Sequence, residues 1–177
     1  MKNVEIRLFL NNWYNNILKT EIELAAINTD LTKTKPAPEK WSPNEILGHL
    51  VDSAINNHRR FILMQLQDNL VFDGYNQNKW VELQSYISKD WKDILNTWTI
   101  LNVNIIKLLE EIGLPSWDRQ FKDHSLDKTA WRSVPKSQPA TMGYLVKDYF
   151  GHMVHHLKQI YFLAQMDNSI GGWFEVG

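Results

Sequence analysis

Two histidines in the stretch GHMVHHLKQI, residues 151–160, have a spacing that suits metal ligands. His152 and His156 are four residues apart, so on a helix they lie on one face, one turn from each other. Two imidazole groups at this spacing can bind the same metal ion. Because such a pair also arises by chance, its meaning depends on a third ligand elsewhere in the chain.

His49 is the best candidate for that third ligand. Of the other histidines outside this stretch, His58 adjoins two arginines and is expected at the surface, and His124 falls in an irregular segment. Helical bundles build metal sites from side chains that project inward from facing helices. His49 with the His152–His156 pair would present three neutral nitrogens to one divalent ion.

Three histidine ligands indicate a catalytic rather than a structural site, because they leave positions open for water or substrate. Imidazole suits zinc, nickel, copper or ferrous iron, and without a carboxylate ligand the ion strongly acidifies a bound water or thiol. Asp148 lies one turn before His152, and Asp52 lies close to His49, so each carboxylate could orient a ligand ring. The alternative is that the histidines are satisfied or solvated side chains on two amphipathic helices.

The helix that carries His49 has the clearest start signal in the chain. Ser42 is a candidate N-cap, Pro43 occupies the first helical position, and Glu45 completes a capping box, so a helix is expected from Pro43 to about residue 67. A polar stripe accompanies its apolar residues at three- and four-residue steps: His49, Asp52, Ser53, Asn56 and Arg60. Such a stripe is typical of a pocket wall, but a solvated outer face has the same pattern.

Apolar periodicity predicts three more long helices, over 3–28, 89–112 and 142–165. Ser88 and Thr141 are the expected N-caps of the second and third of these, and Gly113 is the expected C′ residue that ends the second. A short helix is expected near 79–86.

The segments between these helices are expected to be irregular, with loops at 31–40 and 71–80. The long segment 114–140 is expected to form a lid over one end of the bundle. Trp173 and Phe174 are expected to dock onto the body or onto a partner. With no strand pattern, the predicted fold class is all-α: a single domain, 1–177, built as a four-helix bundle with a long loop before the last helix.

Composition excludes several classes of site. The 177 residues contain no cysteine, which rules out disulfides, metal–thiolate sites and a cysteine nucleophile. The formal net charge of −1 gives no electrostatic footprint for nucleic acid or an anionic membrane. No apolar run suits a signal peptide or a membrane span, so no membrane partner and a cytoplasmic location are expected. The chain also lacks the Glu-x-x-His pair of di-iron proteins and the His-Glu-x-x-His motif of zincins.

Two segments, in this order, resemble the DinB superfamily and its YfiT-like branch. They are KWSPNEILGHLVDSAINNHRRF, which begins at Lys40, and TMGYLVKDYFGHMVHHLKQI, which begins at Thr141. In the family, a tryptophan–serine segment opens a helix with one histidine, and a later helix carries a His-x-x-His-His arrangement. The matching positions are Trp41 and Ser42 for the opening, His49 for the first ligand, His152 and His156 for the other two, and His155 for the extra histidine, which is not usually a ligand.

The resemblance implies a four-helix bundle that holds a divalent metal, often zinc or nickel, on the three histidines. Family members include transferases that use low-molecular-weight thiols such as bacillithiol, and others are described as metal-dependent hydrolases. Many are dimeric, so a homodimer is expected. The chain departs from the family at Tyr75-Asn76-Gln77, where Tyr-Asp-Gln is common, and at SVPKSQPAT, where a His-Pro element is common. Substrate identity is therefore not carried over.

Three functions remain open at this point. The first is a thiol-dependent S-transferase acting on a small-molecule substrate, in which Arg60 and residues of 114–140 hold the carboxylates of the thiol. The absence of cysteine motivates it, because the sulfur nucleophile must come from outside the chain. The second is a hydrolase that uses metal-bound hydroxide, assisted by Asp52 or Asp148. The third is a non-catalytic metal-binding or stress-response bundle.

Overall fold

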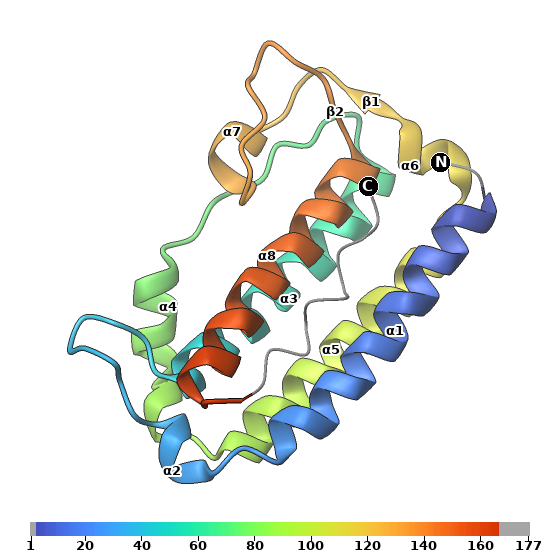
Figure 1. Ribbon diagram of the computed structural model, residues 1–177. Helices are drawn as coiled ribbons and strands as arrows, with labels where there is room; N and C mark the ends of the chain where they lie inside the picture. Colours follow the sequence, from blue (N-terminus) through green and yellow to red (C-terminus); the bar gives the residue numbers. More distant parts are fainter. Residues whose placement is uncertain (1–2, 167–177) are drawn as a thin grey trace.

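Four long helices dominate the computed structural model, which describes residues 3–166 (Figure 1). The long helices are α1 (Asn3–Ala25), α3 (Pro43–Leu66), α5 (Trp91–Glu110) and α8 (Met142–Leu163). The connecting elements are α2 (Thr29–Thr32), α4 (Gln77–Gln84), the 3₁₀ helix η1 (Tyr86–Ser88), α6 (Leu114–Asp118), β1 (Gln120–Phe121), α7 (Leu126–Thr129) and β2 (Ala140–Thr141). The predicted all-α four-helix bundle is confirmed.

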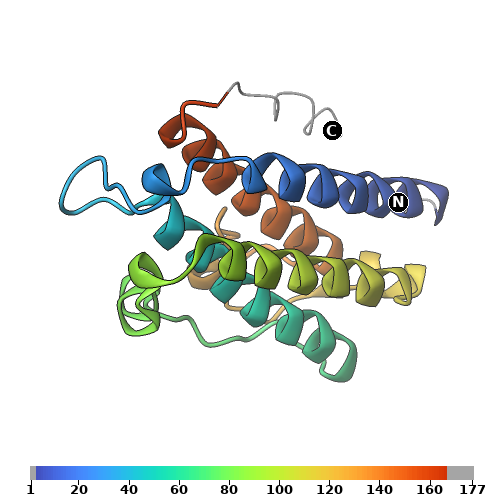
Figure 2. The ribbon, with the colours of Figure 1, turned by 90° about the horizontal axis from the view of Figure 1, so that it is seen from below.

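The long helices enclose one apolar core. α1 packs beside α5, α3 packs beside α8, and contacts between α3 and α5 join the two pairs (Figures 1 and 2). An aromatic cluster links α1 to α8, where the rings of Trp13 and Phe150 stack with their centroids 4.1 Å apart. Buried aromatic residues of this size contribute much of the apolar area that stabilises a bundle. The packing fixes α3 and α8 side by side, which places their histidines within reach of one another.

The start of α3 is fixed by the predicted capping box. The hydroxyl of Ser42 accepts the backbone N–H of Glu45 at 3.3 Å, and the Glu45 carboxylate accepts the N–H of Ser42 at 2.9 Å. Lys35, from the preceding loop, forms an ion pair with Glu45 at 2.7 Å. These contacts satisfy orphan donors of the first turn and hold His49 two turns into the helix.

The back of α3 packs directly against η1. A Cβ atom on Gly48 would lie 2.1 Å from the ring of Tyr86, so the helix backbone itself is in contact with that ring. The side chain of Asn44 donates to the carbonyl oxygens of Tyr86 and Lys89, at 3.0 and 2.9 Å. The sequence between α4 and α5 is thereby tied to the helix that carries His49.

Some expected boundaries are wrong. α1 ends at Ala25 rather than at residue 28, because Asn28 caps the separate helix α2. Asp90 caps α5, since its carboxylate accepts two N–H groups of the first turn, whereas Ser88 ends the preceding 3₁₀ turn. Gly113 has a φ of −62° and caps the start of α6, so it is not a left-handed C′ residue.

The segment 114–140 contains short regular elements. β1 pairs antiparallel with β2, through Gln120 with Thr141 and Phe121 with Ala140. These two-residue strands are too short to show an alternating pattern, which explains why the sequence predicted none. Figure 1 shows the segment across the end of the bundle where α8 begins, as the lid hypothesis expected.

Two further expectations concern the chain termini and membranes. Trp173 and Phe174, which were expected to dock, lie outside the described residues. Within residues 3–166, no helix has both the length and the apolar character that crossing a membrane requires.

Candidate metal centre

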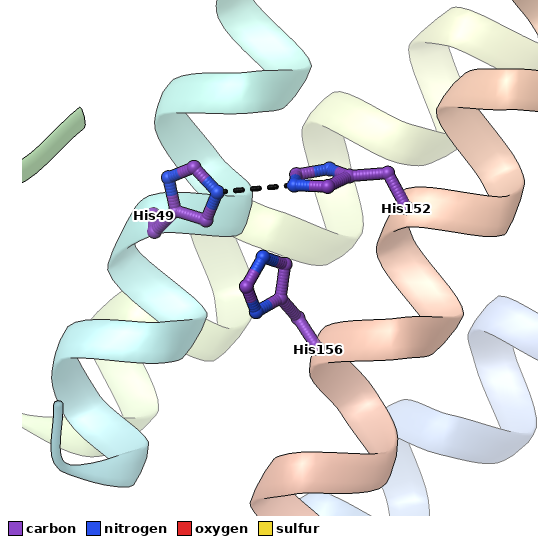
Figure 3. Close-up of side chains that lie close together, drawn as sticks. All are labelled: His49, His152 and His156. Atoms are coloured by element: carbon purple, nitrogen blue, oxygen red, sulfur yellow. Dashed lines mark hydrogen bonds between the residues drawn. The ribbon is translucent and has the colours of Figure 1, made fainter. Parts of the chain in front are cut away.

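Three imidazole groups converge between α3 and α8. His49 comes from α3, and His152 and His156 come from successive turns of α8 (Figure 3). Each ring offers one nitrogen atom such that the three nitrogens all lie within 4.8 Å of one another. The three rings meet edge to face, at interplanar angles of 76° to 87°. The structure therefore brings together the three predicted ligands.

One pair of nitrogens has the spacing of two ligands on a tetrahedral metal. Nε2 of His49 and Nε2 of His152 are 3.2 Å apart. Two nitrogen ligands at the usual zinc distance and a tetrahedral angle would be separated by about 3.3 Å. Nδ1 of His156 lies 2.8 Å from the side-chain amide oxygen Oε1 of Gln159, which can only accept, so the proton is on Nδ1 and Nε2 keeps its lone pair.

Burial keeps the three rings neutral. Burial, together with the neighbouring histidines, lowers the pKa of His49 to about 3, of His152 to about 2 and of His156 to about 4. A metal requires neutral imidazole, which is the form all three side chains have at pH 7. The neutral state of the three rings and the closeness of their nitrogens thus both suit metal binding.

Two tryptophans flank the cluster. The centroid of the Trp41 ring lies 5.0 Å from that of His49, and the Trp131 ring centroid lies 6.3 Å from that of His152. Trp131 also lies above Gly151, where an added Cβ would come within 3.1 Å of its ring. The flanking rings shield the histidines from bulk water on two sides.

Asp52 is buried behind His49, as part of the contact with η1 and α4. One carboxylate oxygen accepts the hydroxyl of Tyr86 at 2.8 Å and the amide of Gln84 at 3.2 Å. The other oxygen is buried without a hydrogen-bond partner among the described residues, and so is Nδ1 of His49. Burial raises the pKa of Asp52, although the two hydrogen bonds act to lower it.

Asp148 does not form the hydrogen bond to His152 that the sequence suggested. Its two oxygens accept the backbone N–H groups of Trp131 and Arg132, both at 2.8 Å. Ser53 is the residue beside His152, with Oγ 3.5 Å from Nδ1. Burial raises the pKa of Asp148, against these two hydrogen bonds, which lower it. Asp148 thus holds the 131–132 segment against α8.

A pocket of about 220 Å³ opens beside the histidines, between α3, α8 and α7. The polar stripe of α3 is therefore an inner face, and a solvated outer face is the wrong interpretation. Arg60 and Asp148 both line this pocket, whereas Asp52 is absent from its wall. The side chains that line it around the cluster include His49, Ser53, Asn57, Arg60, Asp148 and His152.

Sequence reasoning missed the residues that support the ligands. Gln159 lies three residues after His156 on the same helix, a spacing that could have pointed to it. Ser53 lies four residues after His49 and belongs to the polar stripe of α3. The positions of Trp131 and Tyr86 depend on chain segments far from the ligands, and no local pattern reports them. His155 is exposed, with its ring centroid 5.6 Å from that of Trp131, and is not part of the cluster of three histidines.

The chain is similar to known proteins in both sequence and fold. A protein-family model described as the DinB superfamily matches residues 18–160. A curated relative from Oceanobacillus iheyensis, which carries the provisional name of a metal-dependent hydrolase, is 24% identical over 159 residues, covering 86% of this chain and 84% of its own length. YfiT from Bacillus subtilis, described provisionally as a metal-dependent hydrolase with an unusual four-helix bundle topology, has a similar fold. Its TM-score is 0.73 at 19% identity, with 93% of this chain and 89% of that chain covered.

Proposed function

We propose that this chain, which belongs to the DinB superfamily, is an enzyme that binds a divalent metal on His49, His152 and His156. The observation that carries the proposal is the convergence of three neutral imidazole nitrogens within 4.8 Å of one another, with the His49 and His152 nitrogens 3.2 Å apart. Zinc or nickel suits three nitrogen donors best. The three protein ligands leave room for a reactant, as catalytic sites require.

The reaction we propose is S-transfer from a small thiol, of the bacillithiol type, to an electrophile. The metal, when bound, would lower the pKa of the thiol. The thiol loses its proton to water, the sulfur forms a bond to the electrophilic carbon, and the leaving group departs with its electron pair, for example as chloride. The chain has no cysteine, so the sulfur comes from a cosubstrate.

Asp52 serves as a positioning residue in this proposal. Among the described residues, Nδ1 of His49 is a buried nitrogen without a partner, and the second oxygen of Asp52, one helical turn away, is a buried acceptor without a partner. We propose that these two groups pair when the metal is bound. A carboxylate on the far nitrogen fixes the tautomer of a metal-ligating histidine and raises its basicity.

Asp148 instead positions residues 131–132, which we call the roof of the pocket. By holding the backbone N–H groups of Trp131 and Arg132, it keeps the indole of Trp131 over the α8 turn that bears His152. The roof would limit access of water to the reacting atoms, which strengthens electrostatic interactions at the site.

A hydrolase is the second candidate, favoured by the provisional names of the two relatives. In that reaction the oxygen of a water molecule would bond to the carbonyl carbon of an ester or amide, the bond to the alcohol or amine would break, and a proton of the water would pass to that leaving group. The same metal, when bound, would acidify the water. Hydrolysis of esters or amides in the absence of any thiol separates it from the first candidate. A non-catalytic metal-binding bundle would show neither activity.

A homodimer in the cytoplasm, expected from the resemblance and the composition, belongs to the same proposal.

The direct test mixes zinc- or nickel-loaded protein with bacillithiol and a chlorobimane electrophile, and follows bimane fluorescence. We expect acceleration over the free thiol, and loss of that acceleration in His49→Ala. His58→Ala, a half-buried histidine on the same helix but outside the cluster, is the matched control and should keep the activity. No acceleration by wild-type protein, or equal rates for wild type and His49→Ala, would contradict the S-transferase proposal.

A further inference from the structure

Arg60 is a buried cation in the pocket beside the histidines. Its side chain is 6% exposed, and it contributes to the pocket wall eleven residues after His49 on the same helix. Buried arginines ordinarily form ion pairs, because an uncompensated charge in the interior is costly. The surroundings of Arg60 therefore bear on what the pocket holds.

No acidic side chain among the described residues lies within ion-pair distance of Arg60. Its one hydrogen bond is from Nη2 to the carbonyl oxygen of Asp73, at 3.3 Å, and its guanidinium lies 5.5 Å from the ring centroid of Phe72. Desolvation lowers the pKa of Arg60, whereas the negative charge of Asp148, across the pocket, raises it. The carboxylate of Asp148 forms no ion pair with Arg60 and instead accepts a backbone N–H group at each oxygen. Most of the donor capacity of Arg60 is thus left for a ligand.

We propose that the pocket binds a carboxylate group of the substrate, held by Arg60. This inference rests on the proposed function only for the reacting end of that molecule, which would lie at the histidines. Guanidinium groups bind carboxylates through two parallel hydrogen bonds, a geometry that a planar side chain pre-organises. Lys128, exposed at the pocket wall, adds a second positive charge. Asp148 faces the same pocket and disfavours an anion that concentrates two negative charges on one group, such as phosphate, relative to a single carboxylate.

The helix sets the separation between the two ends of the substrate. Eleven residues correspond to about 16 Å along the axis of α3. A long side chain leans toward the N-terminus of its helix, so the guanidinium reaches back toward His49 and shortens that gap. Ser53 and Asn57 line the pocket between them and offer polar contacts. The substrate class is therefore an extended, polar small molecule with a carboxylate remote from its reacting atom.

Binding of a simple dicarboxylate tests the inference without any chemistry. Succinate would be titrated calorimetrically into the metal-loaded protein, with succinamide as the uncharged analogue and inorganic phosphate as the alternative anion. We expect succinate to bind more tightly than both. We expect Arg60→Gln to weaken succinate binding by about 10-fold or more, the range for a hydrogen-bonded charged group. Arg59→Gln removes the same charge from an exposed neighbour and should leave binding within about twofold.

A second variant keeps the test decisive if Arg60→Gln folds poorly. Lys128→Gln should weaken succinate binding by about two- to fivefold, and Lys122→Gln, exposed but outside the pocket wall, should not. Wild-type protein that does not bind succinate, tighter binding of phosphate, or equal succinate binding by both members of each variant pair would overturn the inference.

Turnover separates this inference from the proposed function. Mercaptosuccinate, a thiol with carboxylates, would be compared with neutral 2-mercaptoethanol in the bimane reaction. We expect wild type to favour mercaptosuccinate, and Arg60→Gln to lose that preference through a higher KM. Turnover without any change of preference in Arg60→Gln would overturn the carboxylate site and leave the S-transferase proposal standing. Succinate binding that depends on Arg60, in a protein without turnover, would support the carboxylate site and contradict the S-transferase proposal.

Discussion

The α3 side and the α8 side of the metal centre are built in different ways. On α3, the helix backbone at Gly48 touches the ring of Tyr86, and the carboxylate of Asp52 is held by that same tyrosine. On α8, the corresponding glycine and carboxylate, Gly151 and Asp148, meet the segment that carries Trp131. The α3 side is buried and tightly packed, whereas Trp131 is 40% exposed. One side thus holds a buried histidine in place, and the other supports a partly exposed roof.

The largest expected effect is at Gly48. Gly48→Ala would place a Cβ 2.1 Å from the Tyr86 ring, which is 3% exposed and bonded to Asp52, so neither partner can move away cheaply. We expect a loss of about 3 kcal/mol in the free energy of unfolding, the upper end for overpacking. Urea unfolding followed by tryptophan fluorescence measures it. A loss below about 1 kcal/mol would show that the α3 side is not rigid.

Asp52→Asn tests whether the two carboxylates differ in role. The amide retains a bond to Tyr86 but cannot serve as the charged acceptor for Nδ1 of His49. We expect metal affinity to fall by about 10- to 100-fold, as for other partners of metal-ligating histidines. Asp148→Asn should instead leave metal affinity unchanged and loosen Trp131, seen as a change in its fluorescence. Competition with a chelating dye measures the affinities, and equal effects of the two changes would remove the distinction.

Acid should destabilise the metal-free protein through the histidines. Burial lowers the pKa of His152 to about 2, while the unfolded chain takes up a proton near pH 6.5, so stability present above that pH is lost as the pH falls. Asp52 acts in the opposite direction, because its pKa is raised in the folded state.

His152→Gln should reduce the slope of unfolding free energy between pH 5 and pH 7 by up to about 1.4 kcal/mol per pH unit. Urea unfolding in the presence of a chelator gives the slopes, and His58→Gln is the control outside the cluster. Parallel slopes for His152→Gln and wild type would contradict the burial of a neutral ring.

The smallest effect is expected at Gly151. Gly151→Ala brings a Cβ within 3.1 Å of the Trp131 ring, a contact that this half-exposed indole can relieve by shifting. Alanine also favours a helix over glycine by about 1 kcal/mol, which offsets the contact. We expect a change in unfolding free energy of less than about 1 kcal/mol, together with altered Trp131 fluorescence. A loss as large as that of Gly48→Ala would mean that the roof is as rigid as the α3 side.

The sequence predicted the three-histidine cluster better than its surroundings. Helical spacing placed His152 and His156 on one face, and the Ser42 capping box fixed where His49 lies along α3; the structure has both features. The roles of Asp52 and Asp148 could not be separated, because each depends on a distant segment: Tyr86 for one and residues 131–132 for the other. The polar stripe of α3 was ambiguous for a related reason. Periodicity reveals that a helix has a polar face but not whether another helix covers it.

Elemental analysis of the purified protein tests the central claim most directly. The protein would be loaded with zinc or nickel, dialysed extensively against metal-free buffer, and compared with His49→Ala and His58→Ala treated in the same way. We predict about one equivalent of metal per chain in wild type and His58→Ala, as a single three-histidine site requires, and a large loss in His49→Ala. Metal-free wild-type protein, or equal metal content in wild type and His49→Ala, would contradict the account.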